Sequence, residues 1–156
     1  MTVFASPGAF AIFLQQALTH ASVAAHEGVI KGGEIIRDEA KAEIGHYQGE
    51  AAPFKAWDAL AERTKKDRVR KGFSEDEPLL RTGGLRDSIE VVAEGAEASV
   101  GSALKVALYQ EMGTEKDGSP HIPPRSFLGG AAVRKQDEAI NAMAAPTVAL
   151  LVHGKL

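Results

Sequence analysis

Hydrophobic residues recur at helical spacing near the start of the chain. The apolar positions that share one helix face are Phe10, Phe13, Leu14, Ala17, Leu18 and Ala21. Ser6 followed by Pro7 is typical of a helix start, because serine caps the first turn and proline suits the first helical position. The pattern continues more weakly to Ile44. The sequence therefore predicts a long N-terminal helix that ends at Gly45 or Gly49.

Three glycines fall inside this helix, at Gly28, Gly32 and Gly33. Each costs about 1 kcal/mol relative to alanine in a helix interior. Gly28 and Gly32 are four residues apart and share a face with Ala21 and Ala25. Small residues on one face favour a close helix contact, either within the subunit or between subunits.

A second helix is expected to begin at Pro53. Its common face is formed by Phe54, Trp57, Leu60, Ala61 and Thr64. It would end in a basic run, residues 63–71. The glycine pair Gly83-Gly84 then predicts a tight turn with positive φ.

From Arg86 the hydrophobic period changes to two, with Ile89, Val91 and Ala93 on one side. Gly95-Ala96 can form a two-residue hairpin turn, followed by a return strand over residues 97–101. A short helix is expected next, and it should end at Gly113 in the left-handed conformation. The residues expected to share one face of this helix are Leu104, Leu108 and Met112.

Residues 113–127 are expected to form an extended polar loop. Pro123-Pro124 makes its end rigid, and Phe127 and Leu128 should anchor it in the core. A last helix is expected over residues 130–145. Its inward-facing residues should be Ala132, Ala139, Ile140 and Met143.

These elements predict an α+β fold, in which a long N-terminal helix and further helices pack on a small antiparallel β-sheet. With 156 residues, the chain is expected to form a single domain over residues 1–156. Residues 1–50 would supply the N-terminal helix, and residues 53–156 the mixed region of helices, hairpin and the extended loop 113–127.

The amino-acid composition excludes several classes of site and partner. The chain has no cysteine, which excludes disulfides, zinc–thiolate sites and thiol catalysis. Its formal net charge of -3 does not mark it as a nucleic-acid binder. The apolar stretches near the two ends are too short to span a bilayer. We therefore expect no membrane partner.

No motif for catalysis or for a cofactor is present. The five histidines lack the i, i+4 spacing of a helical metal site. An acidic group on the first helix alternates with Arg37 and Lys41, and is interpreted as a solvated face with i, i+3 and i, i+4 neighbours. That group comprises Glu34, Asp38, Glu39 and Glu43. The protein is therefore not expected to be an enzyme or to hold a metal or other cofactor.

Three segments in a fixed order carry a resemblance. Pro-Leu-Leu-Arg-Thr-Gly-Gly-Leu-Arg-Asp-Ser-Ile precedes the hairpin, and Tyr-Gln-Glu-Met-Gly-Thr and Ile-Pro-Pro-Arg-Ser-Phe-Leu-Gly follow it. The block from Trp57 to Ala132 resembles the tail-completion and neck proteins of lambda-like siphophages and the virion morphogenesis proteins of Mu-like phages. The usual family form has proline where this chain has Ser126.

The resemblance implies a structural virion protein, made in the host cytoplasm and located at the head–tail junction or tail end. It implies a homo-oligomeric ring, expected to be a hexamer, that completes the tail or joins head and tail. The implied partners are neighbouring neck or tail proteins and genomic DNA, which passes through the lumen without sequence-specific binding.

Two sets of candidate contact residues follow. The expected subunit or partner interface comprises Tyr109, Glu111, Thr114, Lys116, His121 and Arg125. Arg125 can pair either with an acidic residue of a neighbouring subunit or with a carboxylate of its own chain, such as Glu111. The alternative function is a DNA-binding accessory protein that uses the basic segment 63–71. Its possible DNA-facing residues are Arg63, Lys65, Lys66, Arg68, Arg70 and Lys71.

Overall fold

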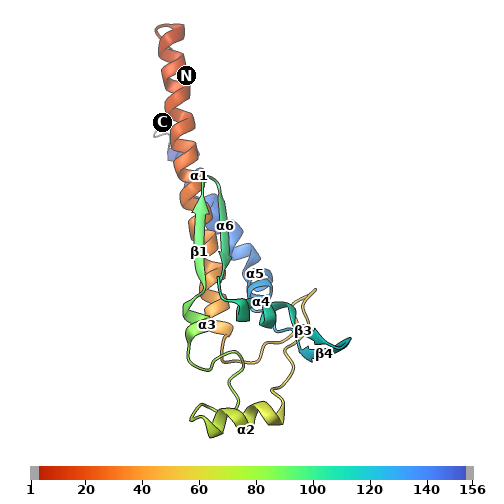
Figure 1. The fold of residues 1–156 in the computed structure, drawn as a ribbon. Helices are drawn as coiled ribbons and strands as arrows, with labels where there is room; N and C mark the ends of the chain where they lie inside the picture. Colours follow the sequence, from red (N-terminus) through yellow and green to blue (C-terminus); the bar gives the residue numbers. More distant parts are fainter. Residues whose placement is uncertain (1–3, 154–156) are drawn as a thin grey trace.

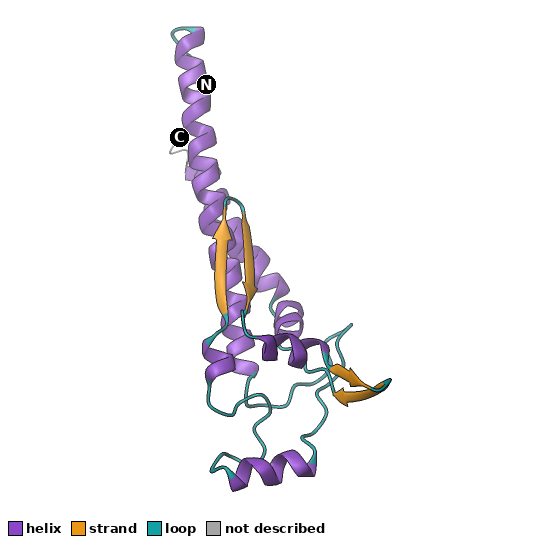
Figure 2. Ribbon diagram, viewed as in Figure 1, coloured by secondary structure: helices purple, strands orange, loops and turns teal. Residues whose placement is uncertain are grey.

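The computed structural model describes residues 4–153, so the expected domain limits at residues 1 and 156 lie outside the described part. The elements follow in the order α1 (Pro7–Glu43), α2 (Glu62–Arg70), α3 (Gly84–Asp87), β1 (Glu90–Glu94), β2 (Glu97–Gly101), α4 (Lys105–Met112), β3 (Thr114–Lys116), β4 (Ser119–Ile122), α5 (Leu128–Arg134) and α6 (Gln136–His153). The predicted α+β class is confirmed. Figure 2 shows the helices and the two small hairpins.

The long first helix is confirmed. α1 contains 37 residues, and the Ser6 side chain accepts a hydrogen bond from the amide of Ala9 at 3.1 Å. The helix ends where Gly45 adopts a φ of 103°, which favours glycine. α6 runs back along α1, and the β1–β2 hairpin lies along another side of it (Figure 1).

The glycines of α1 allow both of these contacts. A Cβ atom at Gly28 would lie 2.2 Å from the carbonyl oxygen of Met143 in α6. A Cβ atom at Gly33 would lie 2.8 Å from Val91 in β1. The close approach expected at Gly28 and Gly32 is therefore made within the subunit, to α6.

We expect Gly28→Ala to destabilise the protein by roughly 2–3 kcal/mol, because the new methyl group meets backbone that only a helix shift can move. Gly49→Ala is the matched control, since nothing lies within 4 Å of a Cβ atom there. Urea denaturation of both variants measures the difference. Equal free energies of unfolding would contradict the close contact between α1 and α6.

The hydrophobic core lies at the C-terminal end of α1, where the chain converges from several elements. Phe127 is fully buried, which confirms its role as an anchor, and Ile89 at the start of the hairpin is 1% exposed. The buried members of this cluster are Ala40, Ile44, Trp57, Ile89, Ala107, Phe127 and Ala131.

The prediction of a helix that begins at Pro53 is wrong for residues 53–61, which are not helical. Ala51 and Phe54 exchange two backbone hydrogen bonds, and the amide of Trp57 donates to the carbonyl of Gln48 at 3.0 Å. These bonds hold an irregular backbone that places Trp57 in the core at 7% exposure. Helix α2 therefore begins only at Glu62.

The hairpin predicted after Arg86 is confirmed, with Gly95 at a φ of 58° between β1 and β2. The prediction of a polar loop over residues 113–127 is wrong for its first half, where β3 and β4 form an antiparallel hairpin. Asp117 and Gly118 both have positive φ, at 53° and 74°. Asp-Gly is a strong turn signal for a two-residue hairpin, and the sequence interpretation overlooked it.

The last expected helix is divided in two. α5 ends at Arg134, and α6 then runs from Gln136 to His153. Ala139 faces inward as expected, but Ile140 is 53% exposed.

Candidate functional site

The candidate site is formed by the end of α4, the β3–β4 hairpin, which we call the arm, and the segment that returns to α5. Figure 1 shows the arm projecting away from the body of the molecule. Gly113 ends α4 as predicted, but its φ of 73° and ψ of 177° differ from the left-handed helical conformation that was expected. A Cβ atom there would lie 2.8 Å from the carbonyl oxygen of Ile122, so the arm closes tightly at its base.

Glu111 joins the two ends of this site. Its carboxylate accepts hydrogen bonds from the Ser126 hydroxyl and from the amides of Phe127, Leu128 and Gly129, the last three at 2.9 Å. These amides belong to the first turn of α5, where helical N–H groups lack partners within the helix. A negative charge is also favourable at a helix N-terminus. Glu111 is therefore an internal clamp rather than the exposed contact residue that was expected.

Ser126 occupies the position where proline was expected. It is 7% exposed, and its hydroxyl supplies one of the four bonds to Glu111. The departure from the expected pattern therefore adds a bond within the clamp.

Arg125 does not pair with Glu111 or any other carboxylate among the described residues, so the expected ion pair within its own chain is wrong. Its Nη2 donates to the carbonyl oxygen of Asp58 at 2.8 Å, and its backbone amide donates to the carbonyl of Gln110 at 2.6 Å. The side chain is 5% exposed, and burial lowers the pKa of the guanidinium group. Arg125 thus fixes the irregular segment before α2 to the base of the arm.

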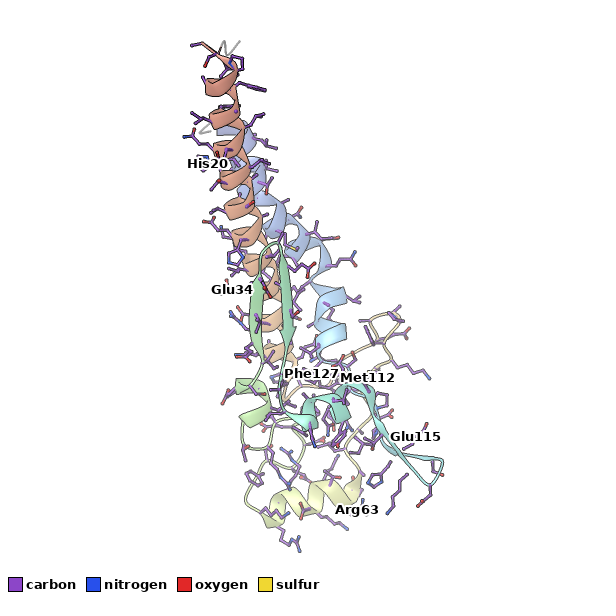
Figure 3. All side chains as sticks on the ribbon, turned by 45° about the horizontal axis from the view of Figure 1, so that its top comes forward. His20, Glu34, Arg63, Met112, Glu115 and Phe127 are labelled. Atoms are coloured by element: carbon purple, nitrogen blue, oxygen red, sulfur yellow. The ribbon has the colours of Figure 1, made fainter. Side chains whose placement is uncertain are left out.

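The remaining predicted interface residues lie nearer the surface. Tyr109 on α4 is 46% exposed, and Lys116 and His121 are exposed on the arm. Thr114 is half-buried at the start of β3, where its hydroxyl oxygen has no hydrogen-bond partner among the described residues. Figure 3 places Glu115 on the projecting arm and Phe127 within the body.

A cleft of about 1010 Å³ brings the two predicted residue sets together. It lies between α2 and the segments that carry His121 and Arg125. The charged and titratable side chains that line it are Arg63, Lys66, Asp67, Arg68, Arg70, Arg81, His121 and Arg125. Asp67 is the single carboxylate in this lining, so the cleft suits an anionic partner.

Most cations of the basic segment already have partners. Asp67 accepts from Arg81 and Arg70, and these bonds hold the pKa of its carboxyl group well below the usual range. Lys71 lies 3.1 Å from the same carboxylate. Lys65 lies 3.3 Å from Asp76.

Arg68 corrects the expected DNA-facing set. It is 5% exposed and donates to the carbonyl oxygens of Ser74 and Leu80, so it holds the segment 74–80 that follows α2 against this helix. Arg63 and Lys66 are exposed and form no ion pair among the described residues. These two cations are the ones left for an external partner.

One buried ion pair was missed by the sequence interpretation. Glu43, expected on a solvated face, is 2% exposed, and its Oε1 lies 2.5 Å from Arg134 Nη1. Arg134 also donates to the carbonyl of Gly49 at 2.7 Å. Glu43 Oε2 has no hydrogen-bond partner among the described residues. Burial raises the pKa of Glu43 to about 7, against the opposing effect of Arg134.

Within residues 4–153, no three carboxylate or imidazole side chains are close enough together to share a metal ion. The same residues contain no helix with the length and hydropathy needed to cross a membrane. The fold and the site define an α+β protein with a clamped, projecting arm beside a cationic cleft. No protein family, curated protein or solved structure matches the chain.

Proposed function

We propose that the protein is a structural virion subunit of a phage neck or tail end. It would assemble with its own copies into a ring, a hexamer in the form that the resemblance implies, and would complete the tail or join head and tail. Its function would then be binding rather than catalysis. DNA would pass through the lumen without sequence-specific contacts.

The observation that carries this proposal is the Glu111 clamp. It ties the Tyr-Gln-Glu-Met-Gly-Thr segment to the Arg-Ser-Phe-Leu-Gly segment through four hydrogen bonds. Two of the three segments that carry the resemblance are thus one structural unit, which holds the base of a projecting arm. A rigid base with polar, exposed side chains at the tip is typical of a contact element, because little ordering entropy is lost on binding.

The proposal is tested by the assembly state of the purified protein. Native mass spectrometry and cryo-electron microscopy should find a closed ring with a lumen wide enough for duplex DNA. The double variant Lys116→Glu/His121→Glu should remain folded but fail to close the ring. Lys55→Glu, at an exposed lysine outside the arm and the cleft, is the control and should assemble normally. A wild-type protein that forms no closed ring at any concentration would refute the proposal.

The second candidate is a DNA-binding accessory protein, favoured by Arg63 and Lys66 at the cleft. Fluorescence anisotropy with a duplex at increasing salt tests it. If these two residues contact phosphates, Arg63→Ala/Lys66→Ala should reduce the slope of log affinity against log salt by about two. Absence of binding at low ionic strength would exclude this function.

A further inference from the structure

The N-terminal part of α1 and the C-terminal part of α6 form a stalk, which we define as residues 7–26 and 139–153. The β1–β2 hairpin covers α1 only as far as His26, whose Nδ1 lies 2.7 Å from the carbonyl oxygen of Gly95 at the hairpin turn. Beyond this point α1 extends away from the rest of the molecule with the last turns of α6 beside it, whereas Ala139 and Met143 at the start of the α6 part pack on Gly32 and Gly28 at the level of the hairpin (Figure 1). His20 marks this exposed region in Figure 3.

The stalk exposes large apolar side chains. On α1, Leu18 is 70% exposed and Val23 is 54% exposed. On α6, Val148 is 53% exposed and Leu151 is 72% exposed. A helix that is apolar on several sides is normally buried in a larger assembly, because its apolar surface would otherwise face water.

One apolar stripe of α1, which we call its seam, continues beyond the end of α6. Its positions follow the 4-3-4-3-4 spacing of a coiled coil and are Phe10, Leu14, Ala17, Ala21, Ala24 and Gly28. α6 covers the lower end, where Ala24 is 8% exposed and Gly28 meets the backbone of Met143. Phe10 and Leu14 at the upper end are each 44% exposed. The same seam therefore has one part covered by α6 and one part open.

α6 carries a second seam that α1 does not cover. Ile140, Ala144, Thr147 and Leu151 repeat at 4-3-4 spacing, about 100° around the helix from the face that carries Ala139 and Met143. An open groove of about 830 Å³ also lies between the two helices, beside Val23 and Leu150, and its lining includes the oppositely charged Glu27 and Lys31 just outside the stalk. These features provide positions for further helices of the same kind.

The charge pattern indicates which kind of partner packs against the stalk. Neither part of the stalk contains Asp, Glu, Lys or Arg. Helices that lie on a membrane surface carry Lys or Arg on their polar face, and partner-specific coiled coils use charged flanking positions. Two copies of an uncharged seam can pack together without charge repulsion. A two-fold axis between two copies of the chain brings the same patch of each copy into contact, so this patch must be complementary to itself.

We propose that the stalk is a self-association surface, which packs against the stalk of a second copy of this chain in a helical bundle. The open part of the α1 seam and the outer seam of α6 would be buried in that contact. This surface is separate from the arm and the cleft, so the inference does not depend on the proposed function.

The test uses the full chain with the exposed leucines replaced, Leu18→Glu/Leu151→Glu. Sedimentation equilibrium from about 1 to about 100 µM is run in the arm variant Lys116→Glu/His121→Glu, in which the proposed ring contacts are removed; this parent should be a dimer or larger, and the added stalk substitutions should give a 16.5 kDa monomer. Val92→Glu, 62% exposed on the hairpin, is the matched control and should keep the parent's mass. A stalk variant with the parent's mass, a control that dissociates equally, or a parent that is itself a monomer would each overturn the proposal.

A second measurement does not rely on loss of assembly. Because the chain has no cysteine, Leu151→Cys introduces a single thiol, which a long bifunctional maleimide should crosslink between copies without requiring the two thiols to meet at disulfide distance. Val92→Cys should remain largely unlinked. The same crosslink should form in the arm variant Lys116→Glu/His121→Glu, so a failure of the ring is distinguished from a failure of the stalk contact. Flotation of monomeric wild type with phosphatidylcholine vesicles, without crosslinking, would instead indicate a lipid surface and overturn the proposal.

Discussion

Replacing Glu111 with alanine should lower the free energy of unfolding by roughly 4 kcal/mol. The substitution removes the acceptor of four hydrogen bonds and leaves the Ser126 hydroxyl and three amides without their partner. A hydrogen bond to a charged group contributes about 1.5–3 kcal/mol, and bonds that share one carboxylate are not additive. For a chain of this length, the expected fall in Tm is roughly 8–16 °C.

Glu115→Ala is the matched control, because Glu115 is an exposed carboxylate four residues further along, on the arm. Its Tm should change by no more than about 2 °C, as for most exposed substitutions. Hydrogen exchange gives a local readout, since the amides of Phe127 and Leu128 should exchange faster in Glu111→Ala and at the wild-type rate in Glu115→Ala. Equal stability of the two variants would show that the clamp does not hold α5 to α4.

Features of the fold that depend on local signals could be predicted from the sequence. The Ser6-Pro7 start, the glycine at position 45 and the change of period at Arg86 act over a few residues, and the observed elements begin and end near them. The missed arm belongs to the same class, because Asp117-Gly118 is also a local signal. These parts need only backbone preferences and hydrophobic spacing.

Contacts between distant segments could not be predicted in this way. Trp57 lies on a plausible apolar helix face, but its burial against the core overrides that local pattern. Arg125 finds the carbonyl of Asp58, 67 residues earlier, although Glu111 is much closer in sequence. Backbone carbonyls carry no sequence signature, so side chains that bind them are visible only in three dimensions.

The sequence pointed to the segment that forms the arm, but not to the contacts that its residues make. The stretch from Tyr109 to Leu128 contains both the arm and its clamp. Glu111 and Arg125, expected at the interface, form their hydrogen bonds within the subunit at the base of the arm, and Lys116 and His121 are exposed on the arm. Only a cation without an ion pair in its own chain is free to bind a phosphate or a partner. In the basic segment 63–71, Asp67 already pairs with Arg70, Lys71 and Arg81, and the sequence alone does not show these pairs.

The buried pair of Glu43 and Arg134 should make stability depend on pH. The pKa of Glu43 is about 7 in the folded protein, compared with 4.5 for an unperturbed glutamate. Between these values the folded state binds more protons than the unfolded state, so the free energy of unfolding falls as pH rises through this window. The full effect of this group is about 3 kcal/mol, and Glu43→Gln should remove it.

Replacing Arg134 should make the free energy of unfolding depend more strongly on pH. Arg134→Met removes the cation that lowers the pKa of Glu43, so at pH 8 the folded variant must keep this buried carboxyl group protonated or leave its charge unpaired, and we expect a loss of roughly 3–5 kcal/mol. At pH 5 the loss should be smaller, because Glu43 takes up a proton and only the hydrogen bonds of Arg134 are missing. Lys135→Met, which removes surface ion pairs with Glu138 and Glu39, is the control and should leave the urea midpoint nearly unchanged at either pH. Urea denaturation at both pH values measures these differences. An equal loss at pH 5 and pH 8 would show that Glu43 does not titrate in this window, and that the buried end of α1 is held by packing rather than by charge.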